Sequence, residues 1–103
     1  MNIPARAREI WRLASAAAHS LAACQMENPS ILLGRGLSDE LMHELAHVSG
    51  GTFKRYRAAD EDSSLIKVWS YFDATAAGLT IYAVKSRPAT SADENIPLRG
   101  SRA

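Results

Sequence analysis

Two histidines and a glutamate near the middle of the chain have the types and the spacing that metal chemistry requires. They are His43, Glu44 and His47 in the stretch "MHELAHVSGG". An α-helix turns about 100° per residue, so on a helix the two histidines share one face and Glu44 lies beside it. Two imidazoles can then converge on one zinc ion, and the carboxylate can activate a water bound to that ion. The chemistry would be metal-assisted hydrolysis.

The five residues "HELAH" resemble the H-E-x-x-H motif of the zincin metallopeptidases, and the resemblance covers these five residues only. It implies that His43 and His47 are zinc ligands and that Glu44 is the general base. Zincins also need a third protein ligand. The chain has no motif for that ligand, only scattered candidates, which are His19, Asp60, Glu61, Asp62 and Asp73.

The same segment is also typical of an ordinary amphipathic helix. Leu41, Leu45 and Val48 form an apolar stripe. If that stripe faces the core, both histidines point the other way, into solvent or toward a partner. The absence of a third-ligand motif favours this second interpretation, because an isolated motif is weak evidence.

A second group of residues could bind through stacking and charge. The stretch "FKRYR" interleaves aromatic and basic residues: Phe53, Lys54, Arg55, Tyr56 and Arg57. On a strand this pattern could form a stacking platform with phosphate contacts, as in proteins that bind single-stranded nucleic acid. The alternative is a solvated strand face, whose charge the nearby acidic stretch 60–64 offsets.

Two further aromatic residues, Trp69 and Tyr71, share one face of the strongest predicted strand. They either belong to the core under the helices or form an exposed binding surface. Tyr82 is a possible cross-strand neighbour.

Two helices are predicted to position these residues. The first runs from about Ala5 to Met26, because apolar residues recur at spacings of three and four. The second begins with Ser38 as N-cap and ends at Gly50 and Gly51. Between the helices, residues 30–36 form a short apolar link that could contain a brief extended piece. The stripe of the first helix consists of Ile10, Leu13, Ala14, Ala17, Leu21 and Cys24, widened on one side by Trp11, Ala18 and Ala22.

Three strands follow, at residues 52–59, 65–72 and 79–86, separated by turns at 60–64 and 73–78. Short connections between consecutive strands predict an antiparallel meander. The predicted fold class is therefore α+β (ααβββ), with both N-terminal helices on one face of a three-stranded sheet and the other face left for solvent or a partner. Residues 1–86 form a single domain, and the polar, proline-containing segment 87–103 is predicted to be a flexible tail.

Composition limits the functional classes. The chain has 103 residues with a formal net charge of +1. This charge argues against a main role in coating nucleic acid or anionic membranes, and it permits self-association. The single cysteine, Cys24, excludes an intrachain disulfide and favours a reducing cytoplasm. No run approaches the ~20 apolar residues of a membrane span.

The stretch "LAAC" before and including Cys24 resembles the lipobox of bacterial lipoproteins. The segment preceding it is mostly alanine and contains Ser15, His19 and Ser20, which is a poor apolar region for a signal peptide. We therefore expect Cys24 to be a packed thiol and not a lipidation site.

The function predicted from the sequence is a small non-enzymatic protein-binding module of the adaptor or inhibitor type, from a bacterium or phage, with no cofactor. It would use its sheet face or its first helix to engage another protein or a second copy of itself. One alternative is a miniature zinc-dependent hydrolase built on His43, Glu44 and His47. Another is a nucleic-acid-binding module centred on the "FKRYR" strand.

Overall fold

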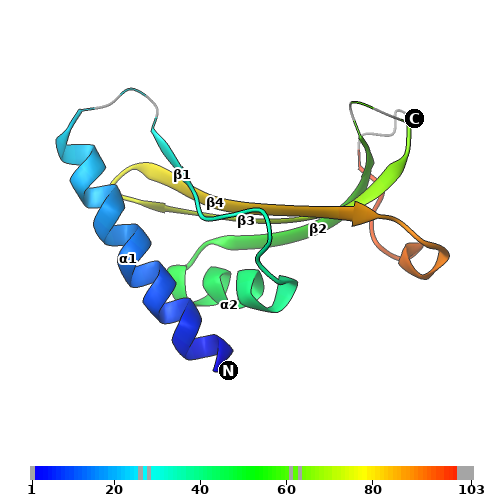
Figure 1. The fold of residues 1–103 in the computed structure, drawn as a ribbon, viewed down its shortest axis with the longest axis horizontal. Helices are drawn as coiled ribbons and strands as arrows, with labels where there is room; N and C mark the ends of the chain where they lie inside the picture. Colours follow the sequence, from blue (N-terminus) through cyan, green and yellow to red (C-terminus); the bar gives the residue numbers. More distant parts are fainter. Residues whose placement is uncertain (1, 26, 28, 61, 63, 100–103) are drawn as a thin grey trace.

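The computed structural model describes residues 2–25, 27, 29–60, 62 and 64–99, which form two helices and a mixed four-stranded sheet (Figure 1). This confirms the predicted α+β class. The sheet has the strand order β1-β4-β3-β2. Along the chain the elements are α1 (Ile3–Ala23), β1 (Ser30–Leu32), α2 (Asp39–Ser49), β2 (Thr52–Ala59), β3 (Ile66–Ala76), β4 (Leu79–Pro88) and a 3₁₀ turn, η1 (Ser91–Asp93).

The prediction of a three-stranded antiparallel sheet is wrong by one strand. β2, β3 and β4 do form an antiparallel meander. In addition, β1, which lies within the predicted link, pairs in parallel with β4 and places Leu32 opposite Tyr82. The N–H of Leu33 continues this pairing by donating to the carbonyl of Tyr82 at 2.8 Å. A three-residue strand is too short to show a period, and its partner is distant in sequence, so the pattern could not indicate it.

Helix α2 begins and ends as predicted. The Ser38 side chain accepts a hydrogen bond from the N–H of Leu41 at 3.2 Å, and Gly50 adopts the left-handed conformation with φ 72°. Leu41, Met42 and Leu45 are buried. Both histidines of this helix are exposed, as the amphipathic interpretation predicted.

Helix α1 packs on α2 through small residues, and the predicted stripe is only partly correct. The buried positions are Ala7, Ala14 and Ala18, whereas Leu13 is 55% exposed. Ala17 and Cys24 are exposed as well, so the buried side is rotated toward Trp11 and Ala18. Alanines at a helix contact allow a short distance between the axes, which explains why α1 buries its smaller side chains. The helix ends at Ala23, and Met26, where the sequence analysis placed its end, lies outside the described residues.

The hydrophobic core lies between the helices and one face of the sheet. Strand alternation directs Phe72 of β3 and Ile81 of β4 toward α2, and both are fully buried together with Met42 and Leu45. The intervening residues of the two strands therefore point to the opposite face.

The β3–β4 connection is tighter than the sequence indicated. β3 continues to Ala76, four residues beyond the predicted end, and the turn consists of Ala77 and Gly78. Both have positive φ, 53° and 80° respectively. Two-residue hairpin loops of this kind need φ above zero at both positions, which is why glycine or asparagine usually marks them. Ala77 is neither of these residues, so the turn could not be recognised from the sequence.

Residues 89–99 follow the end of β4 and return along β2. Arg57 donates its N–H to the Pro97 carbonyl and accepts from the N–H of Arg99, both at 2.7 Å. The Asp93 carboxylate is buried and accepts two hydrogen bonds from Arg87, each at 2.8 Å. Arg87, and after it the N–H of Thr90, hold the pKa of Asp93 well below its usual range. The boundary at residue 86 and the flexible tail stay predictions, although the described residues up to 99 contact the sheet.

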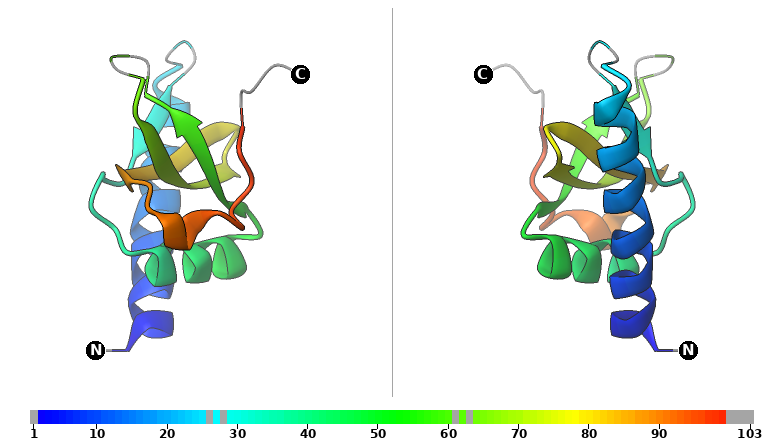
Figure 2. Two further views of the ribbon diagram at one scale, coloured as in Figure 1. Left: turned by 90° about the vertical axis from the view of Figure 1, so that its right-hand side faces the viewer. Right: turned by 90° about the vertical axis from the view of Figure 1, so that its left-hand side faces the viewer.

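Both helices lie on the same side of the sheet, and the other side carries no helix among the described residues (Figures 1 and 2). The molecule measures 44 × 35 × 20 Å, with a Cα radius of gyration of 15.3 Å. A compact domain of about 100 residues has a radius of gyration of about 13 Å. The fold is therefore flatter than a compact domain of this size. Because both helices lie on one side of the sheet, the other sheet face is open. No helix among the described residues combines the length and the apolar character of a membrane-crossing segment.

We expect Gly51→Ala to destabilise the fold, because α2 meets the sheet there without room for a side chain. An added Cβ would overlap the carbonyl oxygen of Asp73 and lie 2.7 Å from the Cβ of Ala74. Overpacking of this kind costs about 1–3 kcal/mol of unfolding free energy. Urea unfolding of the variant measures the loss.

Gly36→Ala is the matched control, because a Cβ at that position meets nothing within 4 Å. It should stay within about 0.5 kcal/mol of the wild type. Equal unfolding free energies for the two variants would contradict the close contact of Gly51 with β3.

Candidate functional site

The sheet face opposite the helices, called here the open face, gathers the tyrosine and tryptophan side chains of three strands. The pairing places Tyr56 beside Trp69, and Tyr71 beside Val84. Residues paired across strands share a face, so these side chains form one surface. All three tyrosines of the chain lie on it. The open face consists of Leu32, Thr52, Lys54, Tyr56, Lys67, Trp69, Tyr71, Asp73, Tyr82 and Val84, all exposed or half-buried.

The rings on this face contact their neighbours. The centroids of Tyr71 and Tyr82 are 6.2 Å apart, and the guanidinium carbon of Arg99 lies 4.7 Å from the centroid of the Tyr56 ring. The Trp69 indole N–H donates to the Ala58 carbonyl at 3.4 Å. Partial burial, and then the charge of Asp73, raise the pKa of the Tyr71 hydroxyl. The belt of rings thus crosses β4, β3 and β2 in a partly desolvated layer.

Charges of both signs lie around the belt. Lys54 is exposed on β2. The ammonium of Lys67 is 2.6 Å from a carboxylate oxygen of Asp60, and Asp73 accepts a hydrogen bond from the Thr52 hydroxyl. The open face therefore has an aromatic centre and a mixed polar margin, which is the usual anatomy of a protein interface.

The five residues of "FKRYR" do not form one surface. Lys54 and Tyr56 point to the open face, whereas Phe53, Arg55 and Arg57 point to the helix side. Arg55 lies 3.3 Å from a carboxylate oxygen of Asp39. Arg57 donates to the backbone carbonyls of residues 96 and 94 at 2.8 and 3.1 Å. Both arginines are thus engaged within the protein.

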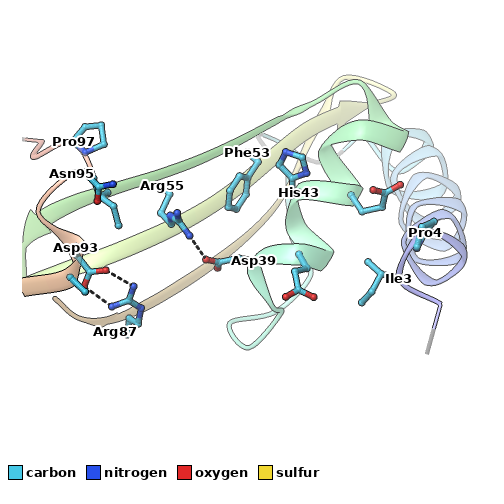
Figure 3. A pocket seen from close by; sticks show the side chains of 14 residues that line it. Ile3, Pro4, Asp39, His43, Phe53, Arg55, Arg87, Asp93, Asn95 and Pro97 are labelled. Carbon is cyan, nitrogen blue, oxygen red and sulfur yellow. Dashed lines mark hydrogen bonds and ion pairs between the residues drawn. The ribbon is translucent and has the colours of Figure 1, made fainter. Parts of the chain in front are cut away.

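A groove of about 960 Å³ lies on the helix side, between α2, β2 and the segment before residue 99 (Figure 3). His43 and Glu44 lie in its wall, and the His43 ring stands edge-on to Phe53 with centroids 5.7 Å apart. Asp39 pairs with Lys85 at 3.0 Å and with Arg55. Burial raises the pKa of Asp39, but hydrogen bonds from Ser70, Lys85 and Arg55 outweigh it and hold that pKa below its usual range.

The histidines of the HELAH segment share one exposed helix face, as the spacing required, and Glu44 is half-buried beside them. Among the described residues, no group of three or more His, Cys, Asp or Glu side chains is arranged to hold a metal ion. Three of the five candidate third ligands have other neighbours: Asp60 pairs with Lys67, Asp73 with Thr52, and His19 with the Ser15 carbonyl at 2.7 Å. Glu61 lies outside the described residues. Zinc binding by His43 and His47 stays a prediction.

Six residues of the open face were missing from the predicted binding surface: Leu32, Thr52, Lys67, Asp73, Tyr82 and Val84. The alternation of residues 79–86 already indicated that Tyr82 and Val84 share a face. Leu32 gave no signal, because residues 30–36 were predicted only as a link that could contain a brief extended piece, and not as a strand of the sheet. Trp69 and Tyr71 lie together as expected, and they belong to the surface and not to the helix-covered core.

The chain matches no protein-family model, and comparisons with curated proteins and with solved structures found no similar chain. The open face and the groove are therefore the features from which a function can be inferred.

We expect the HELAH histidines to bind zinc only weakly. Two imidazoles on one helix supply half of a tetrahedral ligand set, so binding should fall far short of the ~10–16 kcal/mol of four-ligand structural sites. Equilibrium dialysis against zinc at pH 7, followed by metal analysis, measures this, with His43→Ala as the comparison. One tightly held equivalent that His43→Ala abolishes would contradict the expectation and support the zinc hypothesis.

Proposed function

We propose that this protein is a small protein-binding module, of the adaptor or inhibitor type, that acts through the open face of its sheet. The observation that carries the proposal is the belt of Tyr56, Trp69, Tyr71 and Tyr82, which no helix in the described part of the chain covers. Tyrosine and tryptophan supply large contact areas at low entropic cost, and they dominate the binding energy of protein interfaces. We further propose that it comes from a bacterium or phage and acts in the reducing cytoplasm, which suits a chain whose single thiol, Cys24, is exposed.

A protein partner fits this face better than nucleic acid. Binding of a phosphate backbone depends on several free cations beside the stacking rings. Arg55 and Arg57 lie on the other side of the sheet and are engaged there. On the open face, Lys67 is paired with Asp60, and Asp73 adds a negative charge. Lys54, and Arg99 beside the Tyr56 ring, add two exposed positive charges, so the face carries charges of both signs with a small positive excess, which a protein surface can match.

The zinc hydrolase is a weaker alternative because its ligand set is incomplete within the described residues. The outer side of α1, with Leu13 55% exposed, is the other candidate binding surface. Its neighbours Ala16 and Ala17 are small, so it offers less contact area than the open face. Neither feature matches the aromatic area of the sheet.

Site-specific photo-crosslinking tests the proposal directly. A photoreactive phenylalanine analogue replaces Tyr82 on the open face, and the variant is irradiated in the producing cells. We expect one dominant protein–protein adduct, identifiable by mass spectrometry, because a bound partner would lie within reach of this side chain.

The matched control carries the same analogue at Ala17, an exposed position on α1. It should give much less adduct. Adducts from position 17 alone, adducts only with nucleic acid, or none from position 82 would contradict the proposal.

A further inference from the structure

We infer that the occupant of the open face is a second copy of this chain, with the two sheets packed face to face about a two-fold axis. The inference rests on the proposed function, because it names the partner of the same surface. It follows from the order of side chains along β3, the area of the face and the net charge.

The side chains that β3 presents to the open face form a self-complementary series. In sequence order they are Lys67, Trp69, Tyr71 and Asp73. The series has a cation at one end, an anion at the other and two aromatic rings between them. Reversing its direction exchanges the charged ends and exchanges one ring for the other.

A two-fold axis between the sheets, perpendicular to the strands, produces this reversal. Lys67 then faces the partner's Asp73, and Trp69 faces the partner's Tyr71. Each contact occurs twice, as an isologous interface requires. Two twisted sheets can adopt this arrangement with their strands about 30° from alignment.

An axis parallel to the strands gives the opposite result. Lys67 would lie over the partner's Lys67, and Asp73 over the partner's Asp73. Juxtaposed like charges disfavour an interface, so the charges select the antiparallel arrangement. Lys67 can serve a partner carboxylate in addition to Asp60, because an ammonium has three donors.

The area of the face fits a weak, reversible dimer. β3 is 11 residues long and the sheet has four strands. Strands rise ~3.4 Å per residue and lie ~4.8 Å apart. Because some strands are shorter than β3, the face covers roughly 500–700 Å². Standard interfaces bury about 800 Å² per partner, so this face lies near the lower end of the stable range.

The charge of the molecule permits this contact, and its shape determines what meets at the ends. Figure 1 shows the β2–β3 hairpin rising on the open side. With Lys67 over the partner's Asp73, this hairpin lies opposite the partner's β3–β4 turn. A net charge of +1 gives almost no repulsion between two copies.

Charge reversal on β3 tests the arrangement by sedimentation velocity, from ~1 µM to ~1 mM protein. We expect the wild type to dimerise within this range, and Lys67→Glu and Asp73→Lys each to weaken dimerisation at least about tenfold. An equimolar mixture of the two variants should recover wild-type association, because both inter-subunit pairs then join opposite charges.

Arg8→Glu on α1 and Glu94→Lys after η1 are the matched controls, since both residues are exposed and lie outside the open face. They should dimerise like the wild type. Circular dichroism and thermal unfolding check the fold of every variant. If Lys67→Glu unfolds through the loss of its Asp60 pair, Lys67→Gln and Asp73→Asn replace the reversals, with a smaller expected loss of about threefold.

A wild type that stays monomeric at the highest concentration would overturn the inference, as would a mixture that associates no better than its components. Crosslinking from position 82 separates this failure from that of the proposed function. An adduct with a different polypeptide would leave the protein-binding proposal standing and exclude the dimer, whereas the absence of any protein adduct would remove both.

Discussion

The packing of the leucine side of α2 against the sheet is the interaction on which the rest of the structure depends. Leu41, Met42 and Leu45 are almost completely buried, and they meet Phe72 and Ile81 in the core. Each such side chain contributes about 1.5–3 kcal/mol when it leaves water. Rotating the helix would forfeit this burial and bring charged or imidazole side chains to the sheet.

This packing determines where the candidate functional residues predicted from the sequence lie. It turns His43 and His47 outward and leaves them with no third ligand among the described residues. It also gives one face of the sheet to the helices. Strand alternation then separates Arg55 and Arg57 from Lys54 and Tyr56. The other face is aromatic, carries charges of both signs and is covered by no helix of the described residues, and this supports a protein partner.

The sequence predicted well the features that neighbouring residues mark, and it predicted poorly those that depend on contacts between distant residues. The caps of α2 and both ends of β2 were correct because Ser38, Gly50 and Gly51 mark the helix ends and the turn-forming stretch 60–64 follows the strand. β1 was predicted only as a possible extended piece, and its place in the sheet was missed because it depends on pairing with β4. The β3–β4 turn was placed too early because Ala77 adopts a conformation that asparagine or glycine usually marks. The buried side of α1 was misplaced because its alanines pack where larger residues were expected.

Solvent exposure of individual side chains, measured by NMR with a soluble paramagnetic probe, tests the central claim most directly. In dilute protein, the ring protons of His43, His47, Tyr71 and Tyr82 should relax strongly, while the methyl groups of Met42 and the buried leucines stay protected. Raising the protein concentration should then protect the two tyrosines alone. Strong relaxation of the Met42 and Leu45 methyl groups, or tyrosines protected at the lowest concentration, would contradict the account.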